Sequence, residues 1–506
     1  MEAAARTQPC PSGPVYSRRQ PEKTALYRVL QRHLLTFEEQ WTDAQSGRTL
    51  PKFVRQELHG FMACGILAHG FAHLYCDDCG EHYVTAFSCK ARAACPSCLG
   101  RRMNAGAADL VDHVLPAVPI RQFVLTLPFP LRFPLAFDGK LLGEVLRIFT
   151  DTVATWYRKR QPDLPACQTG AVTAIQRASS DLRLNPHFHT LFLDGVYAPS
   201  SDGDGQVFHP DPGPSQQDIE QVVAHARKRI LRFLERRGTI TLVTAPGDGE
   251  VTVVGDETMG EKDPLLATLL AAATAGAPPA GWAQKRKPVR IVCDPDDQPV
   301  AKGTLCAQDG GFDLHAARQV AANDRQGRES LCRYILRPPF ANDRLEILDS
   351  GNVKLGFKKP WSDGTTSVEL APLAFIARLA ALIPAPKRHT VRYCGVLASH
   401  SRVRSQVVPA PATPPPPPAP PPSEQPKPPR RRRYIPWAQL LRRTFEIDLR
   451  CTRCNSELRL IALITTESIA RKILAAMHLP TEAPQLHPAR PPPGPAGAAD
   501  GGDWIN

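Results

Sequence analysis

Apolar residues recur every three or four positions in two long segments of the chain, which places them on one face of an α-helix. The first segment begins at Glu22, and its apolar stripe is Leu26, Val29, Leu30, Leu34 and Phe37. The second begins with Ser215 and Asp218, a pair typical of a helix start, and ends at Gly238. Its apolar face is Ile219, Val222, Val223, Ala226, Ile230, Phe233 and Leu234. The pattern predicts two amphipathic helices.

Three other segments have the shorter apolar runs that are typical of β-strands. The run "RQFVLTLPFPLRFP" from Arg121 begins as a strand and ends at its prolines. The run "GAVTAIQRA" from Gly170 is followed, after a polar connection, by "NPHFHTLFLDG" from Asn185. This order predicts that the last two are neighbouring antiparallel strands.

The strand that begins at Asn185 carries two histidines on one face. Side chains at positions i and i+2 of a strand point the same way, so His187 and His189 share a face. Phe188 and Phe192 lie on the other face. Two interpretations are open at this point: ordinary histidines at a strand end, or a metal site, since neutral imidazole is a common metal ligand.

Composition adds a linker and a class of partner. The 506 residues include 52 prolines, about twice the usual share, and the segment from Pro409 to Pro429 is mostly proline. It predicts an extended linker between a main body and a small tail. The net charge of +13 favours a polyanionic partner, although a merely basic surface is the alternative. The polar face of the second helix is also basic, and it either faces solvent or contacts phosphates. Its basic residues are Arg227, Lys228, Arg229, Arg232, Arg236 and Arg237.

The chain shows neither a signal peptide nor a membrane-spanning run. Its most apolar stretch, from Pro264, is broken by glycine and proline and is too short for a span of about 20 apolar residues. We therefore expect a cytoplasmic protein. Its 14 cysteines should be reduced there, so that paired spacings indicate metal more readily than disulfides.

Two C-x2-C pairs separated by fifteen residues predict one zinc site. The four thiolates of Cys76, Cys79, Cys95 and Cys98 complete a tetrahedral structural site. Cys89 lies between the pairs, as a spare ligand or a buried thiol.

A third C-x2-C pair lies in the tail. Cys451 and Cys454 are only half a site, and the missing ligands are to be sought in His478, His487 or a partner chain.

The sequence does not indicate ATP hydrolysis, because it has no G-x-x-x-x-G-K-[ST] loop, and it has no G-x-S-x-G elbow either. The stretch "SLCRYILRPPFANDRL" from Ser330 stands out instead. Tyr334 lies near the end of a predicted helix that Pro338 stops at about Arg337. Packing is the ordinary role of such a tyrosine.

The whole sequence resembles a known family, the HUH-type rolling-circle transposases of bacterial insertion sequences (the insertion-sequence ninety-one family). The resemblance runs from "YSRRQPEKTALYRVL" to "LHPARPPP" and includes "FSCKARAACPSC", "VLTLPFPLR", "IQRASSDLRLNPHFHTLFLDGV", "LCRYILRPPFANDRL", "KKPWSDGTTSVEL" and "WAQLLRRTFEIDLRCTRC". It implies an α+β fold with an HUH-endonuclease-like central antiparallel sheet and flanking helices.

The resemblance and the composition together predict five parts. These are an N-terminal helical region (1–60), a four-cysteine zinc-binding domain (61–112), the catalytic domain (113–408), the proline-rich linker (409–430) and a basic C-terminal module with its C-x2-C pair (431–506).

The resemblance also implies roles for particular residues. His187 and His189 would bind a catalytic ion, Mg²⁺ by the resemblance, although imidazole ligands suit Mn²⁺ better. Gln176 is the candidate third ligand, and Tyr334 would be the nucleophile that attacks the DNA backbone and forms a 5′-phosphotyrosine link.

The chain departs from the family pattern at two places. Many relatives carry two tyrosines four residues apart on the nucleophile helix, but the position four before Tyr334 is Ser330. The chain therefore resembles a single-tyrosine member. Cys394 stands where the family pattern has histidine, and Tyr393 beside it is a weak candidate for a second tyrosine.

The expected function is transposition through single-stranded or hairpin DNA at element ends, by an enzyme that nicks and rejoins DNA. The sequence leaves open whether it acts as a monomer or an oligomer. One alternative is a plasmid replication initiator or relaxase with the same chemistry. The other is a decayed transposase that acts only as a zinc-dependent DNA-binding protein.

Overall fold

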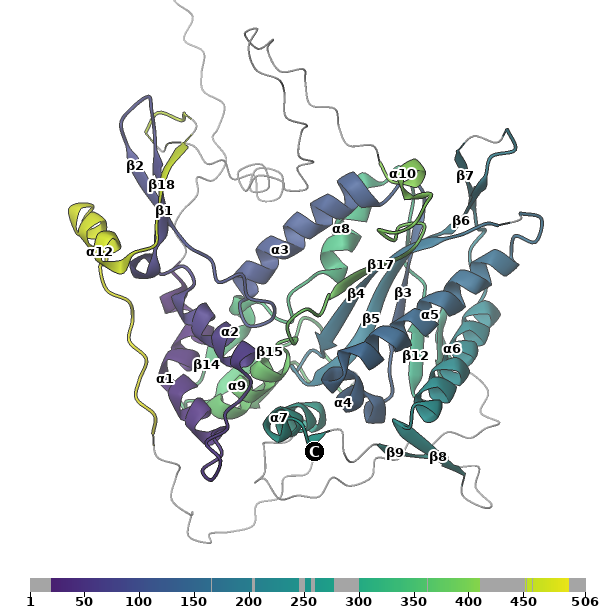
Figure 1. The fold of residues 1–506 in the computed structure, drawn as a ribbon, viewed down its shortest axis with the longest axis horizontal. Coiled ribbons are helices and arrows are strands. Elements are labelled where there is room, and N and C mark those ends of the chain that lie inside the picture. Colours follow the sequence, from purple (N-terminus) through teal and green to yellow (C-terminus); the bar gives the residue numbers. More distant parts are fainter. Residues whose placement is uncertain are drawn as a thin grey trace, which may run out of the picture.

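A large antiparallel sheet forms the centre of the protein in the computed structural model (Figure 1). The structure describes residues 20–409 and 451–490, apart from 165, 203–204, 245–250, 256–259, 277–299, 362, 452 and 457. The strand order is β10-β11-β12-β3-β5-β4-β17, and β13 also pairs with β3. The strands are β3 (Ile120–Thr126), β4 (Gly170–Ala178), β5 (Leu184–Leu193), β10 (Val300–Gly303), β11 (Cys306–Asp309), β12 (Phe312–His315), β13 (Gln319–Val320) and β17 (Val391–Gly395).

Helices cover both faces of this sheet (Figure 1). The face that carries Phe188 and Phe192 packs against α4 (Phe129–Phe137), α5 (Gly139–Lys159) and α6 (Gln216–Arg236). The opposite face packs against α3 (Pro96–Asp109), the π-helical turn η3 (Leu110–Val114) and α8 (Arg325–Ile335). Because both faces are buried, the central strands carry apolar side chains on both sides.

A second hydrophobic core lies beside the sheet. It is built from four helices and a small antiparallel sheet of order β14-β15-β16. These elements are α1 (Ala25–Gln40), α2 (Lys52–Ala63), α7 (Pro264–Ala275), α9 (Pro372–Ala381), β14 (Leu345–Ile347), β15 (Val353–Gly356) and β16 (Ser367–Leu370). The apolar stretch from Pro264 is thus a core helix, and no helix in the described part of the chain is long and apolar enough to cross a membrane.

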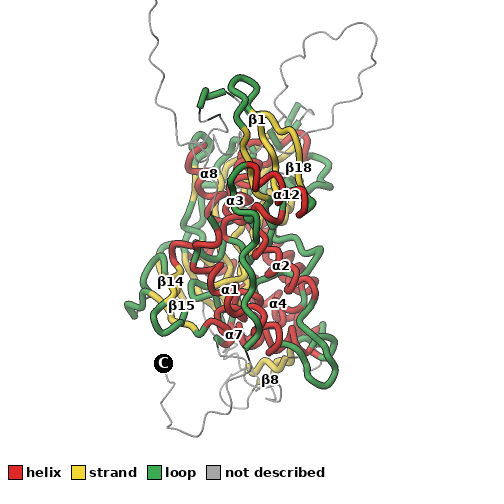
Figure 2. Tube along the Cα trace, turned by 90° about the vertical axis from the view of Figure 1, so that its left-hand side faces the viewer, coloured by secondary structure: helices red, strands yellow, loops and turns green. Residues whose placement is uncertain are grey.

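The third part of the fold joins segments from near the two ends of the sequence. Strand β18 (Arg459–Ile464) pairs antiparallel with β1 (Phe71–Tyr75), which forms a hairpin with β2 (His82–Ala86). Figure 2 shows β1 and β18 side by side, with α12 (Glu467–Ala476) next to them. Helix α12 packs on the 3-10 turn η2 (Leu67–His69) in a small apolar cluster.

Short elements complete the described chain. They are η1 (Pro21–Lys23), β6 (Gly195–Pro199), β7 (Gln206–Pro210), β8 (Ile240–Thr244), β9 (Val251–Gly255), η5 (Asn342–Arg344) and α10 (Arg404–Val407). The predicted proline-rich linker, except its first residue, and the basic run after it lie outside the described residues.

The predicted α+β class is confirmed, and so are the helices and strands that the apolar pattern indicates. Helix α6 begins with a capping box between Ser215 and Asp218. Strands β4 and β5 are antiparallel neighbours. Part of the basic face of α6 is used within the protein: Arg227 forms an ion pair with Asp309 (2.8 Å), and Arg229 donates to Thr152 Oγ1 (2.7 Å).

Candidate active site and cysteine clusters

The two histidines lie in the middle of the central sheet, on the face that α3 and α8 cover. Their rings on β5 are 5.0 Å apart between centroids, as expected for positions i and i+2. On the neighbouring strand β4, Gln176 lies directly opposite His187, and their side chains therefore share this face. The sheet register thus brings together three of the residues that the resemblance assigns to the catalytic ion.

Burial keeps both imidazoles neutral. It lowers the pKa of His187 to about 4, with the positive charges of Arg337 and Arg132 adding to the effect and a hydrogen bond to the Asn185 carbonyl opposing it. Burial, reinforced by His187 and Arg337, lowers the pKa of His189 to about 3. Since only a neutral imidazole has a lone pair to donate, both histidines are in the protonation state that binds metal.

The hydrogen bonds of the two rings also suit metal ligation. His187 donates from Nδ1 to the Asn185 carbonyl (2.7 Å), which leaves the lone pair on its Nε2. Nδ1 of His189 lies 2.9 Å from Nε2 of the buried Gln122 carboxamide. Turning that carboxamide over places Oε1 there instead, so that His189 donates from Nδ1 and its Nε2 is free to ligate. Among the described residues, Nε2 of His189 is buried without a hydrogen-bond partner.

Tyr334 reaches the histidines from the last turn of α8. Its ring meets that of His189 edge to face, with 5.6 Å between centroids and 81° between planes. The Arg337 guanidinium lies over the Tyr334 ring, 4.5 Å from the ring centroid. Gln176 donates from Nε2 to the Ile335 carbonyl (2.8 Å), which ties β4 to the turn that carries Tyr334.

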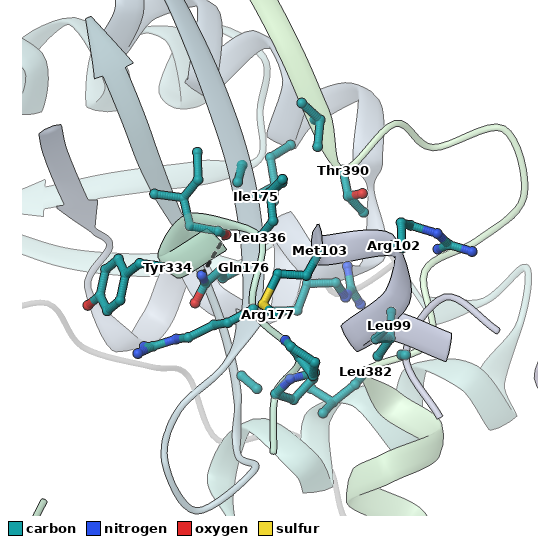
Figure 3. A pocket seen from close by; sticks show the side chains of 18 of the residues that line it. Leu99, Arg102, Met103, Ile175, Gln176, Arg177, Tyr334, Leu336, Leu382 and Thr390 are labelled. Carbon is teal, nitrogen blue, oxygen red and sulfur yellow. Dashed lines mark hydrogen bonds between the residues drawn. The ribbon is translucent and has the colours of Figure 1, made fainter. Parts of the chain in front are cut away.

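A basic cleft of about 820 Å³ opens beside Tyr334 and Gln176. Figure 3 shows Tyr334 at one side of the view and Leu99 and Arg102 of α3 at the other, with Gln176 and Met103 between them. The described lining contains eight arginine or lysine side chains and one carboxylate, that of Asp109. The basic side chains are Arg92, Arg102, Arg177, Arg318, Arg337, Arg344, Lys358 and Lys359. Such a cleft fits a strand of phosphates.

The cysteines form two clusters in the described chain, each with four sulfurs within 4.8 Å of one another. The inner cluster consists of Cys64, Cys89, Cys95 and Cys98. Its Sγ atoms approach to 3.4 Å (Cys64 to Cys98) and 3.5 Å (Cys89 to Cys98). The outer cluster consists of Cys76, Cys79, Cys451 and Cys454. All eight cysteines are free thiols, a donor set that suits zinc.

The predicted grouping of Cys76, Cys79, Cys95 and Cys98 into one site is therefore wrong. The first pair lies at the tip of the β1–β2 hairpin, between Tyr75 and His82. Arms of five residues extend roughly 17 Å, which carries the tip away from the second pair. Cys64 and Cys89 flank the base of the hairpin, where the Gly65 N–H donates to the Phe87 carbonyl, and they complete the inner cluster.

The predicted partners of the tail pair are also corrected. The side chains grouped with Cys451 and Cys454 are Cys76 and Cys79 of the same chain, rather than His478 or His487. His487 lies elsewhere, because its backbone N–H donates to the Gln31 carbonyl on α1.

Helix α3 connects the inner cluster to the cleft. Cys95 is its N-cap and Cys98 lies in its first turn, so that thiolates there benefit from the positive end of the helix dipole. One turn farther on, Arg102 and Met103 line the cleft. The Glu57 carboxylate accepts the backbone N–H groups of Arg92, Ala93 and Ala94, which holds the loop that leads into the helix.

Two residues of these sites, Cys64 and Gln122, were not predicted, and Cys89 was predicted only as a spare ligand or a buried thiol. Cys64 and Cys89 have no C-x2-C spacing, and the available signal was their position on either side of a hairpin pattern. Gln122 belongs to no sequence motif. The only signal was its position two residues before Val124, on the predicted strand that pairs with the histidine strand.

Two transposase family models match the chain. The family described as "Putative transposase" matches residues 170–405, which include His187, His189 and Tyr334. The family described as "Transposase zinc-binding domain", of the insertion-sequence ninety-one type, matches residues 36–127, which include the whole inner cluster. Together the two ranges cover well over half of the chain. No curated protein and no solved structure shows significant similarity to it.

Proposed function

Since the chain is a transposase of the insertion-sequence ninety-one type, we propose that it nicks and rejoins single-stranded DNA at the ends of its element. Tyr334 is the nucleophile, and His187 and His189 bind the catalytic divalent ion on an HUH-type sheet. The observation that supports this most directly is the contact of Tyr334 with His189, whose buried Nε2 has no partner among the described residues.

The proposed cleavage is a transesterification. The phenol of Tyr334 loses its proton, and its oxygen forms a bond to the scissile phosphorus. The bond from phosphorus to the 3′ oxygen breaks, and that oxygen leaves as a 3′ hydroxyl after taking up a proton. One phosphoester replaces another, so that rejoining needs no ATP, in agreement with the missing phosphate-binding loop.

Four side chains serve this step around the tyrosine. The Arg337 guanidinium over the Tyr334 ring is placed to offset the charge of a phosphate at the hydroxyl end. Gln176 holds the last turn of α8 through Nε2, which leaves its Oε1 as the third ligand for an ion. Mg²⁺ or Mn²⁺ at His187, His189 and Gln176 would act as a Lewis acid on the scissile phosphate.

The substrate follows from the cleft lining. Eight basic side chains and one carboxylate favour a polyanion. Trp361 and Tyr393 also line the cleft, and aromatic rings bind unpaired bases by stacking. Bases of a duplex are already stacked inside it, so that this combination favours a single strand.

The test uses single-stranded oligonucleotides that tile the DNA on either side of the gene. Tyr334→Phe keeps the ring and removes only the attacking oxygen, so we expect cleavage to fall more than about 10³-fold while DNA affinity and folding are unchanged. Tyr393→Phe is the matched control, since it removes a hydroxyl from the same cleft and should leave cleavage within a few-fold of normal.

The covalent intermediate gives a second readout. A 3′-labelled strand should remain attached to the denatured wild-type protein, on the peptide that contains Tyr334. Cleavage that persists in Tyr334→Phe, or label on the peptide of Tyr393, contradicts the assignment.

A further inference from the structure

We propose that the outer cluster (Cys76, Cys79, Cys451 and Cys454) is a second zinc site, which clips the C-terminal module onto the N-terminal β1–β2 hairpin. Cys451 and Cys454 lie outside both ranges that the family models match. The site is built by residues more than 370 positions apart, since the Cys79 and Cys451 sulfurs that meet are separated by 372 residues.

The sulfur positions fit a single tetrahedral ion. Cys76 Sγ lies 3.3 Å from Cys454 Sγ, and Cys79 Sγ lies 3.2 Å from Cys451 Sγ. All four sulfurs lie within 4.8 Å of one another. A tetrahedron with zinc–sulfur bonds of about 2.3 Å has edges of about 3.8 Å. This spacing leaves no room among the sulfurs for a cluster of several irons.

The backbone around the two pairs repeats the same turn. In the hairpin, the Cys76 N–H donates to the Glu81 carbonyl (2.9 Å), and the Gly80 N–H donates to the Cys76 carbonyl (3.0 Å). In the tail, Cys451 donates to Ser456 (2.8 Å) and Asn455 donates to Cys451 (2.9 Å).

The residue four positions after the first cysteine has a positive φ in both turns, +74° at Gly80 and +64° at Asn455. Glycine and asparagine are the residues that tolerate this conformation best. Two unrelated segments thus form matching knuckles that face each other, which is the arrangement that a four-thiolate zinc site requires.

Besides the pairing of β18 with β1, the side-chain contacts of the clip are weak. Arg459 pairs with Asp77 (2.7 Å) and Arg453 pairs with Glu81 (3.1 Å), but all four side chains are at least 44% exposed. Exposed ion pairs contribute little to stability. The apolar cluster that α12 forms with η2 and β1 has only four buried residues among those described, Leu67, Phe71, Ala470 and Leu474. A small interface of this kind usually needs a metal or another cross-link to persist.

Metal content tests the site itself. Zinc binding releases thiol protons to the buffer, and serine does not replace a thiolate ligand. We expect two zinc ions per full-length chain, and one in Cys76→Ser/Cys79→Ser and in Cys451→Ser/Cys454→Ser. Because both variants break the same site, combining them should again leave one. Cys306→Ser/Cys394→Ser, at two half-buried cysteines outside the clusters, should keep two.

The clip is tested by cutting the chain between its two halves. A protease site inserted between 410 and 430 separates the C-terminal module, which also contacts α1 through His487. After cutting and dilution, the fragment should stay bound in the wild type and dissociate at least tenfold more readily in Cys76→Ser/Cys79→Ser. That variant leaves the fragment unchanged, so misfolding of the fragment cannot produce the result.

Either measurement can overturn the proposal. Two zinc ions in Cys451→Ser/Cys454→Ser would exclude the tail as a ligand source. A further loss of zinc on combining the two double variants would show that the pairs belong to different sites. Equal retention of the fragment with and without the Cys76 and Cys79 thiols would exclude a clip.

Discussion

The histidine centre and the cysteine clusters are assembled in different ways. His187 and His189 lie on one strand, and Gln176 lies opposite His187 on the neighbouring strand. Each cysteine cluster instead joins segments that are distant in the sequence or separated by a hairpin. The register of β4 and β5 therefore determines where the side chains of the histidine centre lie. In the cysteine clusters, the positions of the sulfurs depend on how whole elements pack against one another.

The three sites also differ in how they are connected to the rest of the fold. The histidine centre depends on the sheet, whose faces are both covered by helices. The inner cluster in turn holds an element of the proposed active site, because Cys95 is the N-cap of α3 and the helix lines the cleft one turn later. The outer cluster touches no residue that lines the cleft among those described, and its loss should spare the chemistry.

The largest expected effect comes from breaking the inner cluster. In Cys95→Ser/Cys98→Ser, α3 loses its anchored first turn, and Arg102 and Met103 lose their fixed position in the cleft. We expect loss of one zinc, a fall in the thermal midpoint of roughly 10 °C and loss of cleavage. Elemental analysis, thermal unfolding and the cleavage assay measure these effects.

The outer-cluster variant Cys451→Ser/Cys454→Ser is the comparison, and it should retain cleavage. Equal loss of cleavage in both variants would contradict the separate roles of the two clusters.

An effect of intermediate size is expected when the pH is lowered, because the buried histidines make the stability of the fold depend on pH. His187 and His189 have folded-state pKa values of about 4 and about 3, below the usual 6.5. The unfolded chain therefore binds more protons between about pH 4 and 6.5, and stability falls as pH drops through that window. For His187 alone the shift corresponds to at most roughly 3 kcal/mol.

Thermal unfolding between pH 7.5 and 5, without added divalent ion, measures this dependence. Acid also weakens thiolate–zinc bonds, so the comparison is between variants. His187→Gln should flatten the fall in the midpoint, and the exposed His225→Gln should not. The same slope in all three proteins would show that the buried histidines do not cause it.

The sequence predicted the parts of the fold that local patterns determine. The apolar spacing gave α1 and α6, and the alternation around His187 and His189 gave their shared face and their antiparallel neighbour. The C-x2-C spacing likewise located each knuckle. It could not identify the partner of each knuckle, because three C-x2-C pairs of identical spacing can combine in several ways.

Tertiary structure decided between those combinations. The β1–β2 hairpin moves Cys76 and Cys79 away from the second pair, and the pairing of β18 with β1 brings the tail to them. Neither the hairpin length nor a strand pairing across the whole chain can be read from cysteine spacing. The contact between the rings of Tyr334 and His189 also could not be predicted from the sequence. It depends on how α8 packs on the sheet, and the sequence motif does not give the distance between the two residues.

The smallest expected effect concerns Gln122, and it depends on a chemical difference between the two kinds of site. A thiolate has one ligand atom, but an imidazole has two nitrogens and needs a partner that fixes which of them is free. Gln122 is that partner for His189. Gln122→Ala should therefore weaken Mn²⁺ binding about 10–100-fold, with cleavage restored at high Mn²⁺, while Gln122→Glu should retain tight binding, because its carboxylate accepts the His189 Nδ1 proton. The dependence of cleavage rate on Mn²⁺ concentration separates these outcomes. If Gln122→Ala lowers the rate equally at every Mn²⁺ concentration, the residue supports the fold of β3 rather than the tautomer of His189.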